Sequence, residues 1–177
     1  MRWAYVFAAI ASLGCSRHAP GASVPPVLRV TDSVVLERSR CFGTCPAYRV
    51  RVSRNGEVLF VSQYPAADRP SVDTVKSWVA DSIVSDAARL GFFDLPSDIR
   101  AGTQPLCQSA ATDLPTITIG VFGSETKRVV YYTGCMLPPK DHPMTRLLPG
   151  IKTLADRIDE LTHTRKHIKP GVGADQS

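Results

Sequence analysis

Two cysteines, Cys41 and Cys45, are the residues whose types and spacing most directly suggest chemistry. They lie in the stretch Cys-Phe-Gly-Thr-Cys-Pro, where Gly43 permits a backbone turn and Pro46 disfavours a helix. Thiols four positions apart across such a turn can reach the Cα separation of roughly 5.5–6 Å that a disulfide needs. The stretch therefore predicts a structural disulfide. A redox-active pair is an alternative, although the two-residue spacing and helix start of thioredoxin-type sites are absent; thiols that bond elsewhere or bind metal are another.

The first 14 residues indicate export. A positive charge at Arg2 precedes an apolar run over residues 3–11, which has the form of a signal-peptide core and is too short for a membrane-spanning helix. The run ends in Ser-Leu-Gly before Cys15, which resembles a bacterial lipoprotein signal with Ser and Leu in reversed order. The resemblance implies lipidation of Cys15, and Ser16 implies sorting to the outer membrane, facing the periplasm. The alternative is an ordinary signal peptide cleaved nearby, which would leave Cys15 free.

Export determines how the remaining cysteines are interpreted. With Cys15 lipidated, four cysteines are left, and an even number in an oxidising compartment predicts two disulfides with three possible connectivities. We favour Cys41–Cys45 and Cys107–Cys135. A zinc site of four cysteines is the alternative, but such a site needs paired ligands at both ends, and Cys107 and Cys135 lie far apart. We therefore expect neither a metal nor another cofactor.

Composition divides the chain into four expected parts. These are a lipoprotein signal peptide (residues 1–14), a flexible tether rich in Ala, Gly, Ser and Pro (15–30), a single α+β domain (31–162) and a disordered basic tail (163–177). The formal charge of +5 is small, and the basic residues form no stripe with interleaved aromatics, so nucleic acid is not an expected partner. The expected partners are the membrane, through the lipid on Cys15, and an envelope protein or cell-wall component.

Two hairpins are predicted within the domain. Apolar and polar residues alternate over 48–53, Asn55-Gly56 follows, and a return strand covers 57–64; Asn-Gly between such runs is the strongest short-range hairpin signal. Runs over 116–121 and 127–132 predict the second hairpin. With a short strand expected from Thr31 to Glu37, the fold class is α+β, with an antiparallel sheet of about four or five strands.

Two helices are predicted to pack on one face of that sheet. Ser71 is expected to cap the first, whose apolar residues recur at helical spacing as far as Leu90. Pro149 suits the first turn of the second. The apolar stripe of the second helix consists of Ile151, Leu154, Ala155, Ile158 and Leu161, and the residues expected to face water are Asp156, Arg157, Asp159 and Glu160.

Several short motifs are distributed along the domain, each of them once. They are Cys-Phe-Gly-Thr-Cys-Pro-Ala-Tyr over 41–48, the Asn-Gly hairpin, Phe92-Phe93, Thr112-Asp113-Leu-Pro-Thr, a Lys-x-Val-x-x-Tyr strand over 127–132 and a final Leu-x-x-x-Ile-Asp helix ending at Asp159. Together they resemble an uncharacterised bacterial family, a domain of unknown function found mainly in exported proteins and lipoproteins. The resemblance extends from Val34 to about Leu161 and implies a shared fold without an assigned activity. The candidate binding residues are Phe42, Gly43, Pro46, Tyr48 and Asp113.

The sequence offers no recognisable catalytic constellation. Its histidines lie in the tether, in a Pro-rich connector and in the expected tail, and there is no Gly-rich phosphate loop or catalytic-zinc helix motif. A non-enzymatic, lipid-anchored envelope module is therefore the leading interpretation. A thiol–disulfide protein that uses Cys41 and Cys45 is the alternative, and a hydrolase or sensor with an unrecognised site is a third.

Overall fold

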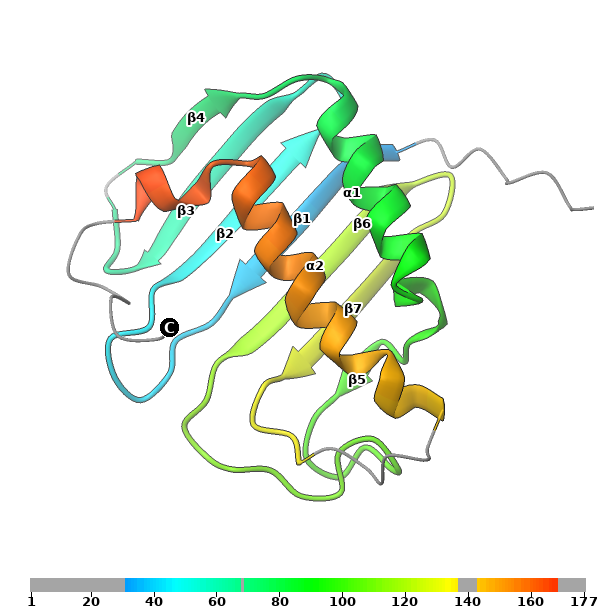
Figure 1. The fold of residues 1–177 in the computed structure, drawn as a ribbon. Helices are drawn as coiled ribbons and strands as arrows, with labels where there is room; N and C mark the ends of the chain where they lie inside the picture. The colour runs from blue at the N-terminus through cyan, green and yellow to red at the C-terminus, as the bar shows by residue number, and fades with distance from the viewer. Residues whose placement is uncertain (1–30, 68, 137–142, 169–177) are drawn as a thin grey trace, which may run out of the picture.

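The computed structural model describes residues 31–67, 69–136 and 143–168, and within them a seven-stranded sheet carries two α-helices on one face (Figure 1). The strand order is β4-β3-β2-β1-β6-β7-β5. The strands are β1 (Thr31–Arg38), β2 (Ala47–Ser53), β3 (Glu57–Tyr64), β4 (Ser71–Thr74), β5 (Asp98–Ile99), β6 (Thr116–Gly123) and β7 (Lys127–Tyr132). The helices are α1 (Trp78–Arg89) and α2 (Leu148–Leu161), with short 3-10 turns η1 (Phe92–Asp94), η2 (Pro143–Arg146) and η3 (Thr164–His167).

The α+β class and both predicted hairpins are confirmed, but the expected number of strands was too low. The hairpins are β2–β3 and β6–β7, and β1 joins them by pairing antiparallel with both β2 and β6. The additional strands, β4 and β5, lie at the two edges, and β5 runs parallel to β7, so the sheet is mixed. Each has four residues or fewer, too short for a clear alternating pattern.

The predicted start of the first helix at Ser71 was wrong. Residues 71–74 pair with β3 instead, and α1 begins at Trp78. Val72 and Val75 are spaced as on a helix, but the pairing satisfies backbone groups of β3 that would otherwise form an open edge. As a consequence, Val72 points away from the helices and is 67% exposed.

The core lies between the sheet and the helices. Strand residues that alternate toward the helices are fully or almost fully buried, as is the predicted apolar stripe of α2 except its last member, Leu161. Phe92, in the turn after α1, is buried, and its neighbour Phe93 is partly buried against the same core. The main strand contributors to this core are Val34, Leu36, Val50, Val52, Val58, Phe60, Ile117, Ile119, Val121 and Val129.

The expected boundary between domain and tail at residue 162 was too early. Residues 164–167 form a turn, η3, that packs back on the sheet, with Thr164 buried. The His167 ring stacks on Phe60 at a centroid distance of 5.2 Å, and Lys166 forms an ion pair with Asp73 of β4. These contacts join the end of the folded region to the β3–β4 edge, which the sequence pattern alone did not indicate.

The predicted signal peptide and tether, with Cys15, lie outside the described residues, as does the end of the predicted tail after Ile168. Within residues 31–67, 69–136 and 143–168, no helix combines the length and apolar character needed to cross a membrane.

Candidate functional site

The cysteine loop between β1 and β2 contains the predicted disulfide between Cys41 and Cys45, whose Cα atoms are 5.6 Å apart. Gly43 adopts a φ of 140°, so the turn uses backbone freedom that other residues rarely have. Cys45 is buried, whereas Phe42 is 89% exposed at the tip. The loop thus has an inner cysteine packed on the domain and an outer aromatic side chain directed to solvent.

Tyr48, three residues after Cys45, faces α2 and donates a hydrogen bond to Asp159. Its hydroxyl lies 2.8 Å from both carboxylate oxygens of Asp159. Arg38, at the end of β1, donates from Nε to Asp159 Oδ2 at 3.0 Å and from Nη2 to Asp156 Oδ1 at 2.7 Å. Strand alternation explains why both side chains reach Asp159, because Arg38 and Tyr48 are cross-strand partners on the side of the sheet that faces the helices.

Burial determines the electrostatics of this cluster. It raises the pKa of Asp159 above its ordinary value, and the charge of Arg38 and the hydrogen bonds to the carboxylate act in the opposite direction. Burial also raises the pKa of Tyr48, and the nearby Asp159 adds to this. Burial acts to lower the pKa of Arg38, but Tyr48 and Asp159 raise it, so the guanidinium stays charged.

Neither Arg38 nor Asp159 was predicted as a site residue. Asp159 was expected to face water, yet its side chain is only 16% exposed, whereas that of Asp156 on the same helix is 70% exposed. The helical pattern placed Asp159 beside Ile158 at the edge of the apolar stripe, where a polar residue is normally solvated. The available signal was Tyr48 itself, since a buried tyrosine hydroxyl usually requires a hydrogen-bond partner.

A cavity of about 750 Å³ opens beside this cluster. It lies between the start of β2, the end of α2 and η3, at the end of the sheet where the cysteine loop is attached. Its wall includes the Arg38, Tyr48 and Asp159 cluster, and its apolar lining consists of Cys45, Pro46, Pro115, Ile117 and Ile168. Exposed charged residues at its rim include Asp156, Glu160 and Arg165.

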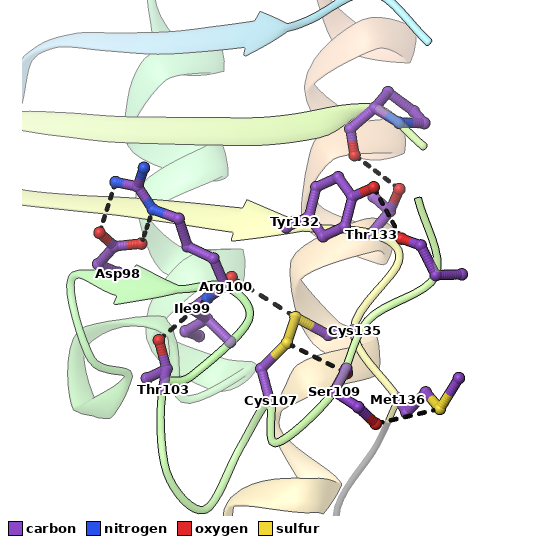
Figure 2. The surroundings of a disulfide bond; sticks show 12 residues. Asp98, Ile99, Arg100, Thr103, Cys107, Ser109, Tyr132, Thr133, Cys135 and Met136 are labelled. Carbon is purple, nitrogen blue, oxygen red and sulfur yellow. Dashed lines mark hydrogen bonds and ion pairs between the residues drawn. A yellow bond between two sulfur atoms is a disulfide. The ribbon is translucent and has the colours of Figure 1, made fainter. Parts of the chain in front are cut away.

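The second predicted disulfide, Cys107–Cys135, is also present and connects the long loop after β5 to the segment after β7 (Figure 2). Cys107 is fully buried and Cys135 is 8% exposed. Around the bridge, the Tyr132 hydroxyl donates to the Ala111 carbonyl at 2.8 Å, and Thr133 Oγ1 donates to the Pro115 carbonyl at 2.6 Å. The long loop is therefore fixed along most of its length.

Asp113 connects the two disulfide-bonded loops. Its backbone carbonyl accepts a hydrogen bond from the Phe42 amide at 3.0 Å, and its φ of 69° is in the left-handed region that Asp tolerates. Its carboxylate accepts from Thr112 Oγ1 at 3.0 Å. Asp113 therefore positions the cysteine loop through its backbone, and it is not among the residues that line the cavity.

Comparison with protein-family models identifies the domain that contains this arrangement. The model of a domain of unknown function, DUF6438, matches residues 32–161. The chain belongs to the DUF6438 family. The predicted resemblance to an uncharacterised domain family is thereby confirmed, and the matched DUF6438 region includes both disulfides and the Arg38–Tyr48–Asp159 cluster. No curated protein matches the chain.

The candidate binding residues of this DUF6438 domain fall into two groups. Pro46 and Tyr48 line the cavity together with Cys45, whereas Phe42, Gly43 and Asp113 do not. In the described part of the chain, no group of three or more His, Cys, Asp or Glu side chains is arranged to hold a metal ion. The arrangement offers a largely apolar hollow with a polar rim, which suits the binding of a ligand.

Proposed function

We propose that this DUF6438 chain is a non-enzymatic binding module of the cell envelope, exported and held at the periplasmic side of the outer membrane by a lipid on Cys15. Its binding site is the cavity between β2, the end of α2 and η3. The observation that carries the proposal is that Cys45, Pro46 and Tyr48 of the cysteine motif border this cavity.

The state of the buried polar groups supports binding over catalysis. Arg38, Tyr48 and Asp159 satisfy one another through hydrogen bonds of 2.8–3.0 Å. A general acid or base must direct its reactive atom at a substrate. These three side chains direct theirs at each other, so they give the cavity a fixed wall.

Site-specific photocrosslinking in intact cells tests the binding site. Benzoylphenylalanine at Arg165, on the cavity rim, is expected to capture an envelope protein or wall component. The matched control is the same probe at Val72, on the face of the sheet opposite the helices. Adducts formed equally from both positions, or from neither, would contradict a binding role for the cavity. Metabolic labelling with a clickable fatty acid tests the lipid anchor. The wild-type chain is expected to incorporate the label, and Cys15→Ser is expected to abolish incorporation.

The exposed position of the cysteine loop favours one other candidate, a thiol–disulfide function. Phe42, Gly43 and Thr44 between the two cysteines are exposed, and Cys41 is partly exposed, so a partner thiol can approach Cys41. In this function the reduced pair would give two electrons to a substrate disulfide. Cys45→Ser would then trap mixed disulfides through Cys41, and their absence in the envelope would exclude this candidate.

A further inference from the structure

A second hollow, of about 630 Å³, adjoins the first at the end of α2. It lies between that end and the segment from Thr74 to Val79, which leads into α1. Glu160 and His163 line both hollows, so the last turn of α2 forms a ridge between two neighbouring depressions. A ligand long enough to cross the ridge can occupy both at once.

Trp78 supplies a flat apolar surface in the second hollow. It is the first residue of α1 and is 56% exposed, whereas the next residues, Val79 and Ala80, are buried in the core. An indole left half in solvent loses much of the burial that normally stabilises a large aromatic side chain. Its ring is therefore available to stack against a ligand.

The charges around the first hollow are largely neutralised. Arg38 is paired with Asp156 and Asp159. Glu160 accepts from Arg157 at 2.7 Å, and Lys166 is paired with Asp73. A polyanion or an anionic lipid surface requires a concentrated positive field. The balance of charges here favours an uncharged ligand.

The backbone of the ridge gives little support to a bound peptide strand. The amide of Thr162 donates to the Ile158 carbonyl at 2.9 Å, and the amide of His163 donates to the Glu160 carbonyl at 3.2 Å. A peptide added as a strand needs free backbone donors and acceptors along its path. The groups left for recognition on the ridge are therefore side chains.

We propose that the two hollows together bind a linear, uncharged glycan of N-acetylated amino sugars. This inference rests on the proposed binding function and names its ligand class. The C–H face of one sugar ring stacks on Trp78, and an acetyl methyl group contacts the apolar wall at Pro46 and Ile168. At the rim, the Glu160 carboxylate accepts hydrogen bonds from sugar hydroxyls, and the Arg165 guanidinium donates to acetamide carbonyls. Volumes of about 750 and 630 Å³ each lie within the range of small-molecule sites, so consecutive rings of one chain can occupy both.

Calorimetric titration of the full chain with the hexasaccharide of N-acetylglucosamine tests the assignment. The hexasaccharide is expected to bind, and Trp78→Ala is expected to raise its Kd by about tenfold or more, because stacking on the indole is lost. Trp78→Phe keeps an aromatic face and should recover most of the affinity. The matched control is Val72→Ala, since Val72 is exposed on the other face of the sheet. It should leave the Kd unchanged.

Two results would overturn the inference. The first is no heat of binding with the hexasaccharide at millimolar concentration, and the second is binding that Trp78→Ala does not weaken although this variant melts like the wild type. If the probe at Arg165 still captures a partner in cells, only the glycan assignment fails and the binding function stands. If neither experiment gives a specific product, both proposals fail.

Discussion

Replacing Tyr48 with phenylalanine tests the central claim about the site, that the tyrosine hydroxyl fixes Asp159 and thereby the end of α2. The substitution removes one oxygen and keeps the ring, which packs against Phe60 at a centroid distance of 5.4 Å. The lost group is the hydroxyl that lies 2.8 Å from both carboxylate oxygens of Asp159. The change therefore isolates the hydrogen bond from the packing.

The expected loss of stability follows from the burial and charge of Asp159. Hydrogen bonds to charged groups contribute about 1.5–3 kcal/mol, and Asp159 keeps its bonds from Arg38 in the variant. We therefore expect Tyr48→Phe to lower the free energy of unfolding by about 1.5–3 kcal/mol. In urea this should appear as a lower midpoint with an unchanged m-value, since the exposed area on unfolding stays the same. Tyr131→Phe is the control, because Tyr131 is buried but its hydroxyl has no hydrogen bond among the described residues.

The pH dependence of this loss has a definite sign. A carboxyl whose pKa is raised by folding contributes stability that is present below its unfolded pKa and lost as pH rises through the folded pKa. The Tyr48 hydrogen bond favours the ionised carboxylate, so its removal raises the folded pKa of Asp159 further. The difference in stability between wild type and Tyr48→Phe should therefore be larger at about pH 7 than at about pH 3. A difference that is the same at both, or that Tyr131→Phe reproduces, would refute the reasoning.

Other features give two further predictions. The Cys107–Cys135 bridge spans 28 positions and the Cys41–Cys45 bridge spans 4. From loop entropy, replacing both cysteines of a bridge with serine should lower the free energy of unfolding by about 3.6 kcal/mol for Cys107–Cys135 and by about 1.9 kcal/mol for Cys41–Cys45. Urea unfolding of the two double variants measures this, and the opposite ranking would contradict the loop-entropy account. Gly56→Ala should destabilise by about 2 kcal/mol or more, because φ is 87° and the new Cβ would collide with the Val75 carbonyl oxygen. Urea unfolding measures this loss as well. Gly102→Ala, with a similar φ but with open space around the new Cβ, should lower the free energy of unfolding by less, and equal losses would exclude the collision.

Local signals made much of this fold predictable. The Asn55-Gly56 turn and the alternation on each side of it defined the first hairpin, because both depend only on neighbouring residues. The spacing of Cys41 and Cys45 across a turn favoured that pair, and with Cys15 set aside for the predicted lipid this left Cys107 to pair with Cys135. The edge strands β4 and β5 could not be foreseen, since their existence depends on pairing with strands already placed in the sheet.

The site was harder to predict for the same reason. Asp159 is separated from Tyr48 by 111 positions and from Arg38 by 121, and nothing near it in the sequence marks it as buried. The same holds for η3, whose His167 is held by stacking on Phe60. The sequence indicated which residues are unusual, and long-range packing decided which of them meet.

The two disulfides stabilise loops at the same end of the sheet. The Cys41–Cys45 loop follows β1, the Cys107–Cys135 bridge holds the loop that precedes β6, and β1 and β6 are antiparallel neighbours. The hydrogen bond from the Phe42 amide to the Asp113 carbonyl joins the two loops, and Pro115 at the base of the second one lines the cavity. A wall fixed in this way loses little conformational entropy when a ligand binds, which increases affinity. Breaking either bridge would remove that rigidity, so we interpret both disulfides as supports of the proposed binding site.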